Sequence, residues 1–319
     1  MRPRRLASPT VVAIVALVVL GGPLPRAQES PAIHYGMNTH YVDARMADKM
    51  RELGAGIVRI DFNWIGMQPR AGSRGYDFEA TDLYVRSARR RGLDVFASVG
   101  YSPKWANGGR SEHAPPLRIQ DWEDFVATVV ERYQGRDMDV RYFGIWNEPD
   151  LHAFFEGSLD DYIALAKTGR QAIRRANGQA KVLGPEVNDR GVVNGYYAAA
   201  MKAVGDQFDI VTVHWYPTDR GSRNLETFLD DYVRPSAMGK PVWLTEVGQT
   251  ACGRGGEEGQ ANLYAHVLDA FQARRSWLNG IFFYDLYEPT SKCSYPPVRV
   301  DWSNRPAFQV YKDAIARNP

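Results

Sequence analysis

The stretch RYFGIWNEPD, residues 141–150, is a short apolar run that ends on an amide and a carboxylate. A run of about five to eight Val, Ile and aromatic residues is typical of a buried parallel strand. Asn147 and Glu148 are costly to bury unless they have partners. A buried strand that finishes on these two residues therefore indicates that polar groups are needed at its carboxyl end.

Seven further runs of this kind occur, and longer amphipathic segments separate them. The eight runs cover residues 33–38, 56–62, 94–100, 140–147, 181–187, 208–215, 241–247 and 280–286. Several of the helical segments between them, such as DFEATDLYVRSARRRG, close on a glycine just before the next run, which is a typical helix stop. Eight strand and helix units in succession predict an α/β fold, a parallel sheet closed into a (β/α)8 TIM barrel.

A doubly wound open sheet is the alternative fold. Such a sheet normally carries a glycine-rich phosphate turn after its first strand, and GMNTHYVD, residues 36–43, has no such turn. The 319 residues could hold two domains by length alone. Because no linker, repeat or low-complexity tract follows the N-terminal segment, we predict a single catalytic domain over residues 28–319.

Residues 1–27 read as a secretory signal. They combine the basic start MRPRR, an apolar run over 11–22 that is too short to cross a bilayer comfortably, and a small residue at Ala27. Since Pro25 and Arg26 make a poor cleavage site, a retained N-terminal membrane anchor is the alternative. The segment predicts a secreted or periplasmic protein.

The charge balance gives no case for nucleic-acid binding. The chain has 39 Lys and Arg against 37 Asp and Glu, and loss of residues 1–27 removes four arginines and no acids, which leaves a net charge of about −2. There is no His-Glu-x-x-His, Cys-x-x-Cys, EF-hand, Walker or Gly-x-Ser-x-Gly motif. No metal or cofactor is therefore predicted.

Polar residues gather where the predicted strands end, and in a TIM barrel the active site lies at those ends. These residues are Asn38, His40, Arg59, Asp61, Asn147, Glu148, His214, Tyr216, Glu246, Tyr284 and Asp285. Glu148 and Glu246 end the fourth and seventh strands, across the barrel mouth from one another. That placement suits two carboxylates cooperating on one bond.

Three motifs carry a resemblance to a known group of enzymes. GIWNEPD (144–150), TVHWYP (212–217) and VWLTEVG (242–248) resemble the clan A retaining glycoside hydrolases. Together with YSPKWA (101–106), these motifs are most similar to glycoside hydrolase family 39, with family 5 as second choice. The resemblance implies that Glu148 is the general acid/base and Glu246 the nucleophile. It also implies that Asn147 holds the sugar 2-hydroxyl.

A retaining mechanism needs one carboxyl group that is protonated at rest and one that is ionised. We expect Arg59 and the Tyr216 hydroxyl to keep Glu246 ionised. Glu148 has no obvious cationic neighbour in its motif, which suits the proton donor. His214 is expected to support the site, although a core histidine is the alternative, and Arg59 could merely tie the barrel mouth together.

Aromatic residues at or beyond the strand ends are candidates for stacking on sugar faces, with core packing as the alternative. They are Trp64, Tyr101, Trp105, Trp215, Tyr284 and Tyr287. Trp105 is the preferred platform outside the reaction centre. Members of the clan often have Trp at the end of strand eight, where this chain has Tyr284, and this departure leaves the sugar preference open.

The two cysteines, Cys252 and Cys293, fall in the loops after strands seven and eight. Because these loops are neighbours in a closed barrel, a disulfide between them is predicted, with two free thiols as the alternative.

The sequence thus predicts a secreted, monomeric retaining glycoside hydrolase that cleaves β-linked polysaccharide or oligosaccharide by double displacement. The barrel leaves no residues for the β-sandwich that family 39 β-xylosidases carry, which favours internal cleavage, for example of an exopolysaccharide. Two rivals remain, a carbohydrate-binding barrel that has lost catalysis and a transglycosylase of wall or matrix glycans.

Overall fold

The computed structural model describes residues 32–217, 224–290 and 293–318. The predicted signal, residues 1–27, and the predicted start of the domain at residue 28 lie outside these ranges. Residues 31–319 form one compact unit. Among the described residues, no helix is long and apolar enough to cross a bilayer.

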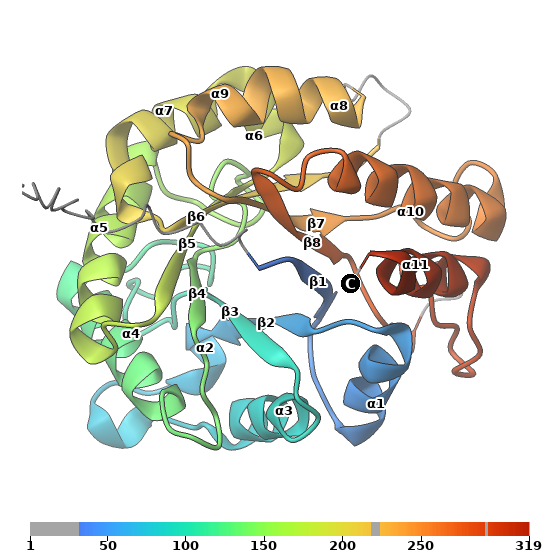
Figure 1. Ribbon diagram of the computed structural model, residues 1–319. Helices are drawn as coiled ribbons and strands as arrows, with labels where there is room; N and C mark the ends of the chain where they lie inside the picture. Colours follow the sequence, from blue (N-terminus) through green and yellow to red (C-terminus); the bar gives the residue numbers. More distant parts are fainter. Residues whose placement is uncertain (1–31, 218–223, 291–292, 319) are drawn as a thin grey trace, which may run out of the picture. The chain divides into compact units, whose positions relative to one another are not determined.

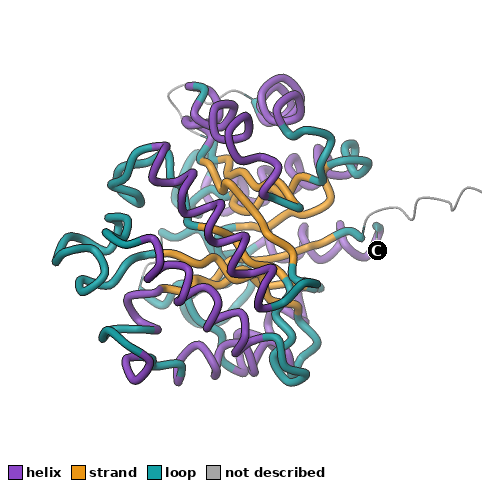
Figure 2. The backbone as a smooth tube through the Cα atoms, turned by 90° about the vertical axis from the view of Figure 1, so that its left-hand side faces the viewer, coloured by secondary structure: helices purple, strands orange, loops and turns teal. Residues whose placement is uncertain are grey.

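Eight parallel strands close into a barrel in sequence order, and helices surround them (Figures 1 and 2). The strands are β1 (His34–Thr39), β2 (Ile57–Asn63), β3 (Asp94–Gly100), β4 (Tyr142–Ile145), β5 (Lys181–Val187), β6 (Ile210–Trp215), β7 (Val242–Val247) and β8 (Leu278–Phe283). Since β1 pairs with both β2 and β8, the sheet is closed. The predicted (β/α)8 TIM barrel is confirmed, and the open doubly wound sheet is wrong.

The helices fill the segments between the strands. They are α1 (Ala44–Leu53), α2 (Trp64–Met67), α3 (Glu79–Arg89), α4 (Ile119–Tyr133), α5 (Leu159–Ala176), α6 (Asp189–Asn194), α7 (Tyr196–Val204), α8 (Leu225–Thr227), α9 (Arg234–Ser236), α10 (Gly256–Gln272) and α11 (Pro306–Arg317). A π-helical segment, Phe228–Val233, joins α8 to α9.

Local sequence fixes where these helices begin and end. The Ser158 side chain accepts from the backbone of Asp161, whose carboxylate bonds back to the Ser158 backbone, so a capping box starts α5. At the end of α1, Gly54 adopts φ 93°, a left-handed conformation that glycine takes at little cost.

A plug of aromatic and aliphatic side chains fills the barrel interior below the strand ends. Its buried members are Ile57, Phe96, Leu183, Ile210, Trp243 and Phe282. Gly280 and Gly36 make room for it, because a Cβ at either position would collide with the Trp243 or the Phe282 ring. The plug leaves the space at the carboxyl ends of the strands to polar groups.

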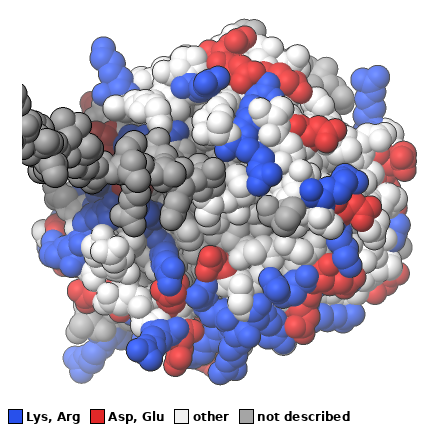
Figure 3. Space-filling model, viewed as in Figure 1, with Lys and Arg blue, Asp and Glu red and all other residues white. Residues whose placement is uncertain are grey.

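The disulfide between Cys252 and Cys293 is present, with the Cα atoms 5.0 Å apart. It joins the loop after β7 to the loop after β8, as the barrel topology predicts. On the face shown in Figure 3, basic and acidic side chains lie intermixed.

Candidate active site

Arg59 on β2 lies at the centre of the polar cluster and is only 4% exposed. Its Nε and Nη2 donate to Oε2 of Glu186 at 2.9 and 2.6 Å, and its Nη1 donates to Oε1 of Glu246 at 2.9 Å. It also donates to the amide oxygens of Asn147 at 2.7 Å and Asn38 at 3.0 Å. Burial lowers the pKa of Arg59, but the charges of Glu186 and Glu246 outweigh this effect and raise the pKa. The guanidinium is therefore a fixed positive charge that bridges strands on several sides of the barrel.

Glu246 on β7 has a donor on each carboxylate oxygen. Besides the bond from Arg59 to Oε1, the Tyr216 hydroxyl donates to Oε2 at 2.6 Å. The structure thus brings Arg59 and Tyr216 to Glu246, as the sequence predicts. Charge-assisted and neutral hydrogen bonds therefore fix the position of both carboxylate oxygens.

Glu148 lies just beyond β4, where the backbone leaves the extended conformation. Trp146 and Glu148 adopt φ 64° and 43°, which is uncommon for residues with a side chain. The Glu148 carboxylate accepts from Nδ2 of Asn188 at 2.7 Å, and Nδ1 of His214 lies 3.0 Å from its Oε1. The GIWNEPD motif supplies no cationic neighbour to Glu148, but the fold brings the His214 imidazole to it from β6.

His214 on β6 is fully buried between three carboxylates. Its Nδ1 also lies 3.6 Å from Oε2 of Glu246, and its Nε2 lies 3.7 Å from Oε2 of Glu186. Burial lowers the pKa of His214, but the charges and hydrogen bonds of these carboxylates outweigh it and raise the pKa to about 10. Burial likewise raises the pKa of Glu148, yet His214 and Asn188 bring it below its ordinary value.

The two carboxylates at the barrel mouth are close together. One oxygen of Glu148, one oxygen of Glu246 and one nitrogen of His214 lie within 4.8 Å of one another. Carboxyl groups stand about 5 to 5.5 Å apart in retaining glycosidases and about 6.5 to 9.5 Å apart in inverting ones. The spacing suits attack by one of the two carboxylates on the sugar.

The same three side chains offer atoms at a spacing that a metal ion could use. A ligating histidine must be neutral, because the imidazolium ion donates from both nitrogens. With its pKa raised to about 10, His214 carries a proton at neutral pH. A metal ion that bound here would have to displace this proton.

Glu186 is a site residue that the sequence reasoning missed. It lies on β5, is fully buried, and also accepts from Oγ of Ser98 at 3.2 Å. Gly144 makes room for it, since a Cβ there would collide with Oε1 of Glu186. The available signal was a glutamate near the end of the apolar run KVLGPEV, the same signal that singled out Glu148. Asn188 follows two residues later.

A cavity of about 270 Å³ opens over the cluster. Its lining residues are His40, Arg59, Asp61, Tyr101, Asn147, Glu148, Phe154, Asn188, Tyr216, Glu246, Tyr284 and Tyr295. We call it the catalytic cavity. A cavity of about 840 Å³ shares His40 and Asp61 with it, and one of about 490 Å³ shares Tyr216 and Tyr295. Each of these two cavities therefore adjoins the catalytic cavity, at a different pair of residues.

Only some of the predicted aromatic platforms reach the catalytic cavity. Tyr101 and Tyr284 line it. Trp64 is fully buried and stacks on Phe125 with ring centroids 5.0 Å apart, and Trp215 is 4% exposed. Because their rings are buried, Trp64 and Trp215 do not offer an open face to a sugar.

Trp105 lines a different cavity, of about 550 Å³, together with Tyr76. Among the described residues, this cavity shares no lining residue with the catalytic cavity. The Trp105 indole donates to the backbone oxygen of Gln68 at 2.9 Å. The expected stacking platform thus lies away from the two glutamates.

Tyr284, which directly follows β8, forms a hydrogen bond with a histidine. Its hydroxyl lies 2.9 Å from Nε2 of His40, and Nδ1 of the same ring lies 3.1 Å from Oδ2 of Asp61. The hydrogen bond to Asp61 raises the pKa of His40 against the opposing effect of burial. Next to Tyr284, burial raises the pKa of Asp285 to about 7.

The sequence of this chain is similar to those of known proteins. A family model described as the glycosyl hydrolase catalytic core matches residues 118–295. A β-xylosidase of Caldicellulosiruptor saccharolyticus is 24% identical over 179 residues, which cover 49% of this chain and 35% of that protein. The alignment therefore spans about a third of the length of this curated relative.

Solved structures share the barrel. A family 39 β-xylosidase from Caulobacter crescentus superposes with a TM-score of 0.74 at 18% identity, covering 90% of this chain and 72% of the other. A family 39 glycoside hydrolase from Bacteroides cellulosilyticus gives 0.69 at 19% identity, covering 89% and 63%. At 18% and 19% sequence identity, this similarity shows that the fold is shared and no more.

Proposed function

Because this chain belongs to the family of glycosyl hydrolase catalytic cores, we propose that it is a retaining β-glycosidase acting by double displacement. Together with the family 39 neighbours, membership confirms the resemblance of the sequence to clan A glycoside hydrolases. The observation that carries the proposed mechanism is the spacing of Glu148 and Glu246, whose carboxylate oxygens lie within 4.8 Å in unlike surroundings.

Glu246 is the nucleophile in this proposal. Arg59 and Tyr216 each donate to one of its oxygens and stabilise the carboxylate that attacks the anomeric carbon. The new bond forms between a carboxylate oxygen and that carbon, while the bond from the carbon to the leaving oxygen breaks. Asn147, fixed by Arg59 at 2.7 Å, is suited to bind the 2-hydroxyl of the sugar.

The leaving oxygen takes a proton from the pair formed by Glu148 and His214. The pair holds one transferable proton across 3.0 Å, and the high pKa of His214 places it on the imidazole in the free protein. A bound sugar removes water from Glu148, which favours its neutral form, so the proton passes to the carboxylate and on to the leaving oxygen. In the second step, Glu148 accepts a proton from the water that hydrolyses the glycosyl ester.

The adjoining cavities support internal cleavage of a chain. The cavities of about 840 and 490 Å³ meet the catalytic cavity at different residue pairs, so sugar units can extend from it in two directions. The β-xylosidase relative makes β-xylosides the first substrates to test. Residues 1–27 support export of the protein from the cytoplasm, and a polysaccharide outside the cell is the substrate we propose.

The proposal is tested with aryl β-glycosides and a panel of polysaccharides. We expect release of the aryl group with retained anomeric configuration by nuclear magnetic resonance, and its loss in Glu246→Gln. For Glu148→Ala, azide should restore turnover of an activated aryl glycoside and yield the β-glycosyl azide. Sugar binding without release from any substrate would instead support a binding barrel, and transfer to added sugar acceptors would support a transglycosylase.

A further inference from the structure

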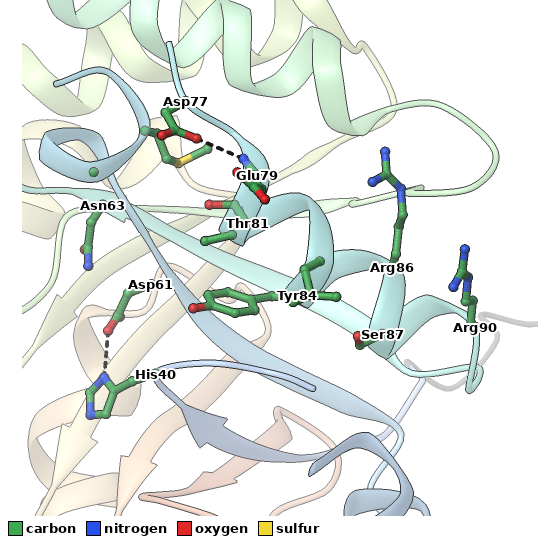
Figure 4. Close-up of a pocket in the computed structure, with 14 residues that line it drawn as sticks. His40, Asp61, Asn63, Asp77, Glu79, Thr81, Tyr84, Arg86, Ser87 and Arg90 are labelled. Carbon is green, nitrogen blue, oxygen red and sulfur yellow. Dashed lines mark hydrogen bonds and ion pairs between the residues drawn. The ribbon is translucent and has the colours of Figure 1, made fainter. Parts of the chain in front are cut away.

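A large groove adjoins the catalytic cavity on the side of α3. It has a volume of about 840 Å³ and starts at His40 and Asp61, which also line the catalytic cavity. From there it follows α3 as far as Arg90 (Figure 4). We call this cavity the α3 groove. The α3 groove and the catalytic cavity thus meet at the hydrogen-bonded pair His40 and Asp61.

The lining of the α3 groove has the composition of a sugar-binding surface. Figure 4 shows the Tyr84 ring projecting from α3 toward Asp61 and His40. Tyr84 is half-buried, so one part of the ring is held by the core while another part is open. Thr81 and Asn63 add a hydroxyl and an amide beside it. An aromatic face flanked by a few polar groups suits the C–H faces and hydroxyls of a sugar ring.

Charges of both signs line the α3 groove. Asp61, Asp77 and Glu79 supply carboxylates, while Arg86 and Arg90 supply guanidinium groups. Arg86 is already bonded to Asp82 at 3.0 Å, and His40 to Asp61 at 3.1 Å. With no excess of positive charge, the groove offers no attraction to a chain of uronic acids and suits uncharged sugars.

We propose that the α3 groove binds uncharged sugar units on one side of the cleaved bond, with Tyr84 as the stacking platform. This inference rests on the proposed glycosidase function and adds the class of substrate and the residue that binds it. The aromatic contact is worth roughly 0.5 to 1.5 kcal/mol, which corresponds to a change of about twofold to tenfold in kcat/KM.

The test uses the full chain, an aryl β-glycoside, and linear β-linked xylose, glucose and mannose oligomers from the disaccharide to the hexasaccharide. We expect kcat/KM to rise with length for the oligomer that is cleaved. Tyr84→Ala should lower kcat/KM on the hexasaccharide about twofold to tenfold and leave the aryl glycoside unchanged, while Tyr84→Phe should retain both activities. Tyr84→Leu keeps more of the buried volume if the alanine variant does not fold.

Tyr76→Ala is the matched control, because Tyr76 is also half-buried but lines the separate cavity with Trp105. It should not change the dependence on chain length. An equal loss on the aryl glycoside and the hexasaccharide in the Tyr84 variants would overturn the inference, as would cleavage of the aryl glycoside with no oligomer of the series cleaved. If neither kind of substrate is cleaved, the proposed glycosidase function itself fails.

Discussion

Nδ1 of His214 lies 3.0 Å from Oε1 of Glu148, so the imidazole and the carboxyl group titrate as one unit. Neither side chain is next to the other in sequence, and they come from β6 and from the segment after β4. The acid of the proposed reaction is therefore a pair of residues, and its proton affinity is set as much by His214 as by Glu148.

Replacing His214 tests this pairing. In His214→Gln the cation beside Glu148 is lost, and we expect the pKa of Glu148 to rise because burial then dominates. The proton donor would then be the carboxyl group alone, whose pKa is lower than that of the imidazole at about 10. The basic limb of the kcat/KM profile on an aryl β-glycoside should therefore move to lower pH. An unchanged basic limb would show that His214 does not share the proton.

The ion pair between Arg59 and Glu186 is predicted to matter for folding as well as for activity. Both side chains are buried, and Arg59→Met would leave the Glu186 carboxylate without its guanidinium, at a cost of about 3 to 5 kcal/mol. Arg59→Met with Glu186→Leu should recover much of that loss in urea unfolding, but not the activity. Arg91→Met, which breaks the surface pair with Asp48, is the control and should change unfolding far less. Additive losses in the double variant would contradict this coupling.

Asp285 is predicted to make stability depend on pH. Burial raises its folded-state pKa to about 7 from an ordinary value of 3.8, and the facing groups are His40, Glu288 and Glu246. The folded protein therefore binds the proton more tightly than the unfolded chain, and stability from this group falls as pH rises from about 4 to about 7.

Asp285→Asn should thus have little effect on Tm near pH 4 and raise Tm relative to the wild type near pH 8. The exposed Asp206→Asn variant is the control and should show no such trend. A difference in Tm between Asp285→Asn and the wild type that stays constant over this range would refute the assignment.

The disulfide between Cys252 and Cys293 closes a loop of 41 residues. In the chain-entropy model its removal costs on the order of 3 to 4 kcal/mol, because the unfolded chain regains freedom. We expect Cys252→Ser with Cys293→Ser to lower the free energy of unfolding by this amount in urea titration. The disulfide does not involve Glu148 or Glu246, so activity on an aryl β-glycoside should persist at low temperature. Equal unfolding midpoints with and without the bond would count against this estimate.

The barrel was predictable because each strand corresponds to a separate apolar run in the sequence. Eight apolar runs spaced by amphipathic segments allow few other folds, and the predicted runs overlap all eight strands. The ends were less accurate. The run at 140–147 contains β4, which ends at Ile145, because Trp146 already adopts a left-handed conformation. Periodicity does not encode that turn, which directs Glu148 into the site.

Contacts between distant strands were harder to predict. The motifs led to Glu148, Glu246, Arg59 and Tyr216, but Glu186 on β5 carries no motif and has room in the site because Gly144 on the neighbouring strand β4 is small. For the tryptophans, the sequence predicted residues at the site that the structure places in the core. Position near a strand end does not say which way a ring points, and Trp64, which begins α2, turns into the core against Phe125.

The bond of Arg59 to both Glu186 and Glu246 has a consequence for how related chains can diverge. A barrel that gave up cleavage and kept only sugar capture could exchange Glu148 or Glu246, which line the catalytic cavity although both are buried. In a barrel that has lost Glu246, Arg59 and Glu186 could disappear only as a couple, since either one alone then leaves a charge without this ion-pair partner inside the barrel. Retention of both residues in a homologue would therefore indicate that the barrel fold is inherited, and would not show that the homologue still cleaves glycosidic bonds.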